Sequence, residues 1–475
     1  MAKILAFCHW DSPKGSVPFF RFEKWKRIPC GYAYDIKLCH FVTAFLFFFL
    51  LIFLGFSCAN AQDKFGFPET TSRIAIIADQ LPAHMTKAQI RFAATHYVGS
   101  QKLTLNITKR LRRYNPKFVV LHYHLGIWQQ QPAHQFIIDG KHWGNDWKFV
   151  NQHESWFWHN EKGKRVRSRI DGKYLMNIAN RDFQNYWKKS IAHQIIMGQY
   201  QAVFLDSSSP ALLQWEASYA DPRLARDAVM WRRFKELKGL TWSEAYAVFM
   251  SDLTAFLEFL GFATLPNIGA LCTTWDTTDY YTTASGAFME GAFDTHSVAD
   301  WKMAMERTLR LIKQDKIIIF QSYIRNHHDY EKRMYYLACY LLIKGRYCYL
   351  NYFTGSTLSW YPEWNLDLGK PFDVYVDSLQ DLMVGEGLYH RKYEKGEVWV
   401  NIAKKSKTIH FEKPVFKVVP HGGGPVNKKG EHPGHITLEK VTKVTLKPWN
   451  GLVVLYRESF ARNDEEGVIA RPARP

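Results

Sequence analysis

The feature that most constrains the fold is an alternation, between residues 73 and 353, of short apolar runs with segments of helical periodicity. The apolar runs predict strands at residues 74–78, 95–99, 118–124, 174–178, 202–206, 263–268, 287–293, 317–323 and 347–353. The periodic segments predict helices at residues 86–92, 106–114, 182–196, 242–260, 297–313 and 330–343. Strands that alternate with helices are typical of an α/β protein built on parallel strands.

The number of predicted strands favours one α/β architecture over another. Eight or nine strands in a stretch of this length suit a (β/α)8 TIM barrel, which we assign to residues 62–365. A doubly wound sheet is the alternative, and it usually has a glycine-rich turn after its first strand. The first turn here reads Ala78-Asp79-Gln80-Leu81-Pro82, so no dinucleotide or phosphate site is expected there.

The pattern changes after about Leu368, where helical periodicity is absent. Short strand-like runs lie at residues 374–375, 388–393, 397–401, 407–412, 416–420, 436–439, 441–446 and 451–456. They predict a small all-β, β-sandwich-like C-terminal domain over residues 366–460. The polar tail, residues 461–475, is predicted to be disordered.

The N-terminal part contains one long apolar run, residues 41–56, which holds no charge. It follows Lys37 and precedes Ala59-Asn60-Ala61, a pattern typical of a secretory signal cleaved before Gln62. Residues 1–61 therefore predict export to the periplasm, the cell surface or the medium. At 16 residues the run is short for a membrane span. An uncleaved signal anchor is the alternative, and it would be the only contact with a membrane.

The amino-acid composition indicates which classes of partner this protein could bind. The formal charge of +18, from 62 Lys and Arg against 44 Asp and Glu, would attract anionic polymers, including acidic polysaccharide. No known nucleic-acid-binding signature accompanies the basic clusters at residues 109–113 and 162–169, so no nucleic acid is expected. The seven cysteines form no CxxC pair, which argues against a metal site. No cofactor is expected.

Two carboxylates end predicted strands of the barrel, where catalytic groups of such folds lie. Asp206 closes the strand at residues 202–206, and Glu290 lies in an otherwise apolar and small-residue run. Burial raises the pKa of a carboxyl group, which suits a general acid at Glu290. Either residue could instead be structural: Asp206 could cap the next helix, and Glu290 could bond to backbone or to a lysine.

Other polar and aromatic residues near strand ends predict a surface that binds sugar hydroxyls and ring faces. Asp79 closes the first strand and is expected to orient substrate rather than to react. His122 and His124 share one face of their strand, with Tyr123 on the other. The full set of expected substrate-binding residues is Asp79, His122, His124, Trp128, Asn267, Trp275, Gln321 and Tyr323.

Several of these stretches resemble the TIM-barrel glycoside hydrolases of glycoside hydrolase-like family 15. The stretches are Leu205-Asp206, Leu265-Pro266-Asn267, residues 286–293 with Glu290, and, towards the C-terminus, residues 368–371, 389–393 and 396–401. The resemblance implies a reaction class, hydrolysis of a polysaccharide by two carboxyl groups, with Asp206 as nucleophile or base and Glu290 as acid. An inactive barrel that binds polysaccharide in an export or surface assembly remains the alternative, and a basic protein that binds anionic polymers is a third.

Overall fold

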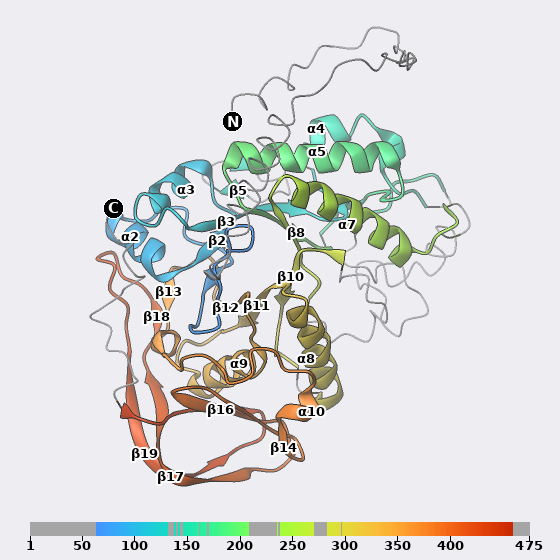
Figure 1. The fold of residues 1–475 in the computed structure, drawn as a ribbon. Coiled ribbons are helices and arrows are strands. Elements are labelled where there is room, and N and C mark those ends of the chain that lie inside the picture. The colour runs from blue at the N-terminus through green and yellow to red at the C-terminus, as the bar shows by residue number, and fades with distance from the viewer. Residues whose placement is uncertain are drawn as a thin grey trace, which may run out of the picture. The chain divides into compact units, whose positions relative to one another are not determined.

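A computed structural model describes residues 63–131, 146–160, 162–168, 171–208, 238–269, 283–295 and 297–458, with residues 137, 138, 141, 142 and 235. All of them belong to one compact unit, Ala61–Pro475 (Figure 1). The predicted signal segment and the predicted disordered tail lie outside the described residues. Among the described residues, no helix has the length and apolar character that crossing a membrane requires.

Eight parallel strands form the centre of the fold, in two sheets. The first sheet has the order β1 (Ile77–Ala78), β2 (Gly99–Gln101), β3 (Val119–Leu125), β8 (Ala202–Asp206) and β9 (Ala263–Pro266). The second has the order β10 (Gly286–Glu290), β11 (Ile317–Tyr323) and β12 (Cys348–Phe353). Parallel bridges also join Asn267 to Phe288 and Ile76 to Leu350. The predicted α/β class with parallel strands is therefore confirmed.

In the part of the chain that the structure describes, six helices accompany these strands, and a polar side chain begins each of them. They are α2 (Lys87–His96), α3 (Leu105–Arg112), α5 (Arg181–Gly198), α7 (Trp242–Phe259), α8 (Val298–Lys313) and α9 (Tyr330–Ile343). Their N-caps are Thr86, Thr104, Asn180, Thr241, Ser297 and Asp329, and each side chain accepts a bond from a backbone N–H of the first turn.

Side chains alternate between the two faces of each strand. Val119, Leu121 and Tyr123 of β3 join a cluster that we call the interior cluster. Its other buried members are Phe67, Ala75, Ile77, Ala202, Phe204, Ala263, Leu265, Phe288, Ile317, Ile319, Tyr347 and Tyr349. The residues between them, such as Val120 and Val203, join a larger core that includes the helices. Both faces of these strands are thus buried, as is usual in parallel sheets.

Two predicted strands are corrected by the structure. Residues 95 and 96 belong to α2, and the neighbouring strand β2 begins only at Gly99. The run at residues 174–178 is not part of the parallel set. It contributes β7 (Tyr174–Leu175), which pairs antiparallel with β4 (Trp128–Gln129). This long excursion between β3 and α5 also holds β5 (Ile137–Ile138), β6 (Lys141–His142), α4 (Trp147–Val150) and the 3-10 helix η3 (Glu154–Trp156).

The C-terminal part consists mainly of strands, as predicted, and six of them form one antiparallel sheet. Its order is β14 (Met383–Gly385), β15 (Leu388–Lys392), β16 (Gly396–Asn401), β20 (Asn450–Leu455), β17 (Lys407–His421) and β19 (His435–Leu446). Four predicted strands merge into the two long strands β17 and β19, and residues 374–375 form none. The elements between β12 and this sheet, and within it, are β13 (Ser359–Trp360), η5 (Pro362–Asn365), α10 (Leu379–Leu382) and β18 (Gly424–Pro425).

Helix α9 lies between the parallel strands and this antiparallel sheet (Figure 1). The approach is close, because a Cβ on Gly451 of β20 would lie 2.4 Å from the Cβ of Ala338 in α9. Arg391 of β15 donates hydrogen bonds to the carbonyl oxygens of Leu341, Leu342 and Lys344 at the end of the helix. The antiparallel sheet therefore covers one face of α9.

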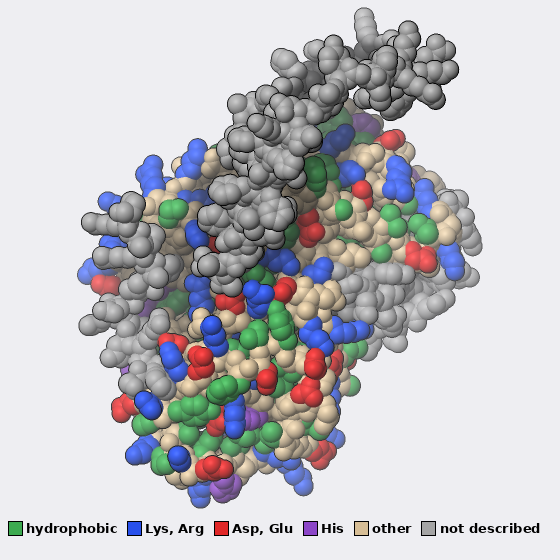
Figure 2. All heavy atoms as spheres, viewed as in Figure 1, with side chains coloured by type: hydrophobic (Ala, Val, Ile, Leu, Met, Phe, Trp, Pro, Cys, Tyr) green, Lys and Arg blue, Asp and Glu red, His purple; other side chains and the backbone are tan. Residues whose placement is uncertain are grey.

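Charged side chains are mixed on the face that Figure 2 shows. Lys and Arg are interspersed there with Asp and Glu, rather than gathered in one patch.

Candidate active site

Polar side chains gather where the parallel strands end. Asp206 lies two residues after Phe204, and Glu290 lies two residues after Phe288, so both share a face with the interior cluster. The carboxyl ends of parallel strands open on the same side of a fold. The remaining polar members of this group are Asp79, Tyr123, Asn267, Gln321, Tyr323 and Asn351.

The side chain of Asn267 joins the two carboxylates. Its Nδ2 donates to Asp206 Oδ1 at 3.1 Å and to Glu290 Oε2 at 2.6 Å. The two distances together limit the separation of those oxygens to about 5.7 Å. The two carboxylates predicted from sequence are thus neighbours, well inside the separation of roughly 12 Å beyond which they could not work on one bond.

Asp206 is held in its charged form. Tyr123 Oη donates to Asp206 Oδ2 at 2.7 Å, and the backbone N–H of Ser207 donates to Oδ1 at 2.8 Å. Burial raises the pKa of Asp206, but the bond from Tyr123 and the charges of Lys173 and Lys102 outweigh it, so this pKa lies below its ordinary value. Ser207 has a φ of 52°, a conformation that non-glycine residues rarely adopt.

Glu290 is held by two donors on neighbouring strands. Tyr323 Oη donates to Oε1, and Asn267 donates to Oε2. Burial and the hydrogen bond to Glu290 raise the pKa of Tyr323, so its hydroxyl keeps its proton. Each carboxylate therefore has a tyrosine of its own and shares one amide with the other.

Asp79 lies deeper and is tied to β2. Lys102 Nζ lies 3.0 and 3.1 Å from its two carboxylate oxygens, and Gln101 donates to Oδ1. Burial raises the pKa of Asp79, while the ammonium of Lys102 opposes that shift. The same ammonium lies 5.1 Å from the centre of the Tyr123 ring, so Lys102 connects Asp79 to the residue that holds Asp206.

Gln321 also lies in this group of polar side chains, where it forms a hydrogen bond with another member of the group. Asn351 Nδ2 donates to Gln321 Oε1 at 2.9 Å. Sequence analysis did not identify Lys102, Tyr123 or Asn351 as site residues. Alternation of side chains along β12, from Tyr349 to Asn351, would have identified Asn351. Lys102 was missed because the strand before it was predicted to begin four residues too early.

The prediction that His122 and His124 line this site is wrong. They lie on the other face of β3, against the helical layer. The ring of His122 stacks on Tyr200 at 5.6 Å, and that of His124 packs edge-on to Trp187 at 5.5 Å. Burial lowers the pKa of His122 to about 3. The alternation of side chains along a strand shows which residues share a face. Because both faces of a parallel strand are buried, the alternation does not show which face carries the site.

The expectation for one sugar-binding tryptophan is also corrected. Trp128 is only 1% exposed and is buried in the main core. A fully buried ring has no face to offer a sugar. Trp275 lies outside the described residues.

A hollow lies beside the ends of β10 and β11. It has a volume of about 540 Å³ and is lined by Gly291, Asp294, Tyr323, Arg325 and Lys332. Among its lining residues, Tyr323 connects it to the candidate site through the hydrogen bond to Glu290, and neither carboxylate lines it. Within the part of the chain that the structure describes, no group of three or more His, Cys, Asp or Glu residues is placed to hold a metal ion.

Parallel strands with neighbouring Asp and Glu side chains at their carboxyl ends are an arrangement found among glycoside hydrolases. The family described as hypothetical glycosyl hydrolase family 15 matches residues 112–397, more than half of the chain. The chain belongs to this family, as its sequence motifs predicted.

Solved structures resemble the chain only distantly. A noncanonic maltogenic α-amylase from Thermotoga neapolitana has 9% identity and a TM-score of 0.41, over 80% of this chain and 98% of its own. An α-amylase from Lactobacillus plantarum has 11% identity and a TM-score of 0.41, over 81% and 99%. The isomaltulose synthase of Protaminobacter rubrum has 11% identity and a TM-score of 0.42, over 80% and 98%. No curated protein matches the chain.

Proposed function

We propose that this protein is a glycoside hydrolase that cleaves a polysaccharide, with Asp206 and Glu290 as its two catalytic carboxyl groups. The observation that carries the proposal is the contact of Asn267 with both carboxylates, which brings them to one site. Membership of a glycosyl hydrolase family supports the reaction class.

The roles follow from the surroundings of each carboxylate. Asp206 is the nucleophile, because its low pKa keeps it ionised. In the first step one of its oxygens bonds to the anomeric carbon, the glycosidic C–O bond breaks, and Glu290 gives its proton to the leaving oxygen. In the second step Glu290 takes a proton from water, and the resulting hydroxide oxygen replaces Asp206 on the sugar.

The spacing supports retention of anomeric configuration. Retaining enzymes hold their carboxyl groups about 5–5.5 Å apart, and inverting enzymes hold them about 6.5–9.5 Å apart to leave room for a water. The nearest oxygens here are at most about 5.7 Å apart. Asp206 is therefore assigned the nucleophilic role rather than that of a general base.

The proposal includes a closed (β/α)8 barrel at residues 62–365 and a second domain at residues 366–460. Strand pairing supports closure, because the bridges Asn267–Phe288 and Ile76–Leu350 carry the pairing from β9 to β10 and from β12 back to β1. A closed ring of eight strands would explain why residues from β3, β8, β9, β10 and β11 meet at one site.

Export is a separate part of the proposal. It rests on the charge-free run at residues 41–56 and on Ala59-Asn60-Ala61. N-terminal sequencing of the protein from its native host should begin at Gln62. A cellular product that retains Met1 would contradict cleavage.

The reaction is tested by reducing-sugar release from neutral and acidic polysaccharides. Wild-type protein should release reducing ends from at least one of them, and Asp206→Asn should release none above background. Thermal unfolding of both proteins controls for folding. Wild-type protein that binds a polysaccharide without cleaving it would favour the inactive, polysaccharide-binding barrel instead.

A further inference from the structure

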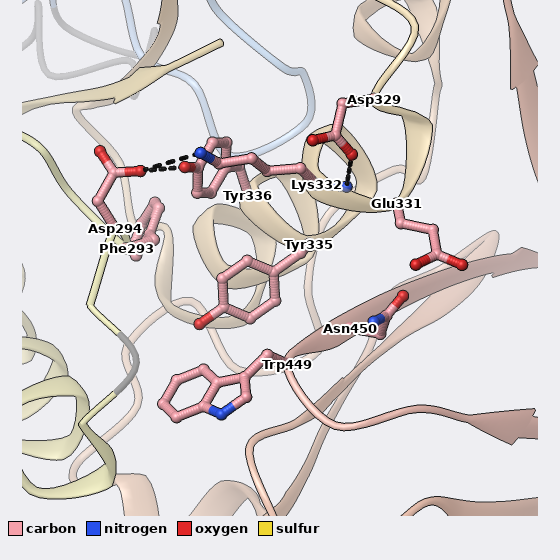
Figure 3. A pocket seen from close by; sticks show the side chains of 9 residues that line it. All are labelled: Phe293, Asp294, Asp329, Glu331, Lys332, Tyr335, Tyr336, Trp449 and Asn450. Atoms are coloured by element: carbon pink, nitrogen blue, oxygen red, sulfur yellow. Dashed lines mark hydrogen bonds and ion pairs between the residues drawn. The ribbon is translucent and has the colours of Figure 1, made fainter. Parts of the chain in front are cut away.

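A second hollow lies next to the first, away from the two carboxylates. It has a volume of about 250 Å³, and Figure 3 shows the nine side chains that surround it. Asp294 and Lys332 line both hollows, and their charged groups lie 3.8 Å apart. The two hollows are therefore neighbours, and they are separated by the ion pair of Asp294 and Lys332.

Three parts of the fold build this second hollow, and the turn after β10 supplies Phe293 and Asp294. The start of α9 supplies Glu331 and Tyr335, and the turn between β19 and β20 supplies Trp449 and Asn450. Glu331 also pairs with Lys447 in that turn at 2.7 Å. The antiparallel sheet thus contributes directly to the second hollow, which neighbours the hollow lined by Tyr323.

The aromatic side chains give the hollow a flat apolar wall. Trp449 is half-buried, and its ring packs edge-on to Tyr335 with centroids 6.2 Å apart. Trp449 also has a φ of 55°, which costs free energy for a residue with a side chain of this size. Phe293, which also lines the hollow, has a φ of 68°, so two aromatic residues around it adopt this uncommon conformation.

The charged side chains around the hollow favour one class of ligand over another. Its lining has the carboxylates of Asp294, Asp329 and Glu331. Lys332 pairs with Asp294 and Lys447 pairs with Glu331, so the carboxylates exceed the ammonium groups by one. Carboxylates accept hydrogen bonds from hydroxyl groups but repel other carboxylates. An apolar ring face beside hydroxyl acceptors suits a neutral sugar, and the excess of negative charge disfavours a uronic acid.

We propose that this second hollow binds a neutral sugar unit of the polysaccharide whose cleavage is proposed above, with Trp449 stacking on the sugar ring. The inference rests on the proposed function for the identity of the polymer. Its volume is below the roughly 300–1,000 Å³ of pockets for drug-sized ligands, which fits one sugar unit rather than several. The substrate is then a neutral polymer, although the whole chain carries a formal charge of +18.

Affinity electrophoresis tests the inference without requiring turnover. The protein is the full chain with Asp206→Asn, and the probes are soluble starch, dextran, laminarin, galactomannan, polygalacturonate and alginate. At least one neutral polymer should retard the protein more strongly than either acidic polymer does. Trp449→Ala should weaken that binding about 3- to 10-fold, the range expected for loss of one aromatic contact.

Two further variants guard against loss of folding. Phe372→Ala is the matched control, because Phe372 is 67% exposed and lines neither hollow, and it should bind as the parent does. Glu331→Ala removes a side chain that is 64% exposed and should weaken binding about 2- to 5-fold without a change in thermal unfolding.

Three results would overturn the inference: unchanged binding by Trp449→Ala and Glu331→Ala, stronger binding of the acidic polymers, or retardation by none of the polymers. Failure of the proposed hydrolysis looks different. Wild-type protein would then release no reducing ends, while Trp449→Ala would still weaken binding.

Discussion

The hydroxyl of Tyr123 controls the charge of Asp206. Because its hydrogen bond lowers the pKa of that carboxyl, Tyr123→Phe should raise this pKa. A nucleophile must be ionised, so the acid limb of the kcat/KM profile should move to higher pH. At neutral pH, kcat/KM should fall on the order of 10- to 100-fold, as expected when a hydrogen bond to a charged group is lost.

Tyr200→Phe is the control for this variant. It also removes a buried tyrosine hydroxyl, one that donates to the carbonyl of Leu103 away from the site. Its acid limb should coincide with that of the wild type. An acid limb unmoved by Tyr123→Phe would show that Asp206 does not govern the profile.

His122 affects the stability of the fold and does not line the candidate site. Burial lowers its pKa to about 3, and the nearby His124 adds to the shift. The unfolded chain takes up a proton near pH 6.5 and the folded chain does not, so this contribution to stability is present above pH 6.5 and is lost as the pH falls towards 3. Between pH 7 and 5, wild-type protein should lose about 1–2 kcal/mol more unfolding free energy than His122→Phe, measured by urea unfolding. Parallel losses in the two proteins would contradict the assignment.

Much of the site could be read from single residues. Alternation from the apolar residues of each strand places Asp206, Asn267, Glu290, Gln321 and Tyr323 on one face, and the structure brings these together. The prediction chose the wrong face of β3. It placed His122 and His124 at the site, whereas Tyr123, on the opposite face, contacts Asp206. Nothing local distinguishes the two buried faces of such a strand, because the difference arises only when the strands assemble.

At the scale of elements, β10 presents Glu290 only because Gly286 lets it approach β11. A Cβ on Gly286 would lie 2.0 Å from the carbonyl oxygen of Ile317 and 2.6 Å from Leu265 Cδ2. Gly286→Ala should therefore lower the free energy of unfolding by about 1–3 kcal/mol or more and should reduce kcat, because β10 must move.

Gly385→Ala is the matched control in the antiparallel sheet. Its added Cβ would lie 4.0 Å from Leu388 Cβ, an ordinary contact. The change in unfolding free energy should stay within about 0.5–1 kcal/mol. Equal effects of the two variants would show that the approach of β10 to β11 is not a constraint.

Helices were predicted better than strands for a local reason. Capping side chains such as Thr86 and Ser297 begin helices within one turn of sequence, and the prediction for α9 matches Tyr330–Ile343. Strand limits depend on partners far along the chain. The apolar run at residues 174–178 looked like a barrel strand, yet it pairs antiparallel with Trp128–Gln129 outside the parallel set.

At the scale of the whole molecule, the antiparallel sheet completes the core. Tyr389, Val398, Val453 and Leu455 of the sheet belong to the same buried cluster as Leu337 and Leu341 of α9. Truncation after residue 365 should expose that helix face and make the protein insoluble. Truncation after residue 460, which removes only the predicted disordered tail, should leave solubility and thermal unfolding unchanged. A soluble fragment 62–365 with the parent's unfolding temperature would refute this role.

The assignment of the two carboxylates is tested most directly by how Glu290→Gln responds to the leaving group. A general acid matters for a poor leaving group and little for one that departs without a proton. On the cleaved polysaccharide, Glu290→Gln should lose about 10²- to 10⁴-fold in kcat/KM, but on a dinitrophenyl glycoside of the same sugar it should stay within about 10-fold of wild type, while Asp206→Asn loses both activities. Equal, mild losses on the two substrates in both variants would contradict the account and leave the carboxylates as ligand contacts of a binding protein.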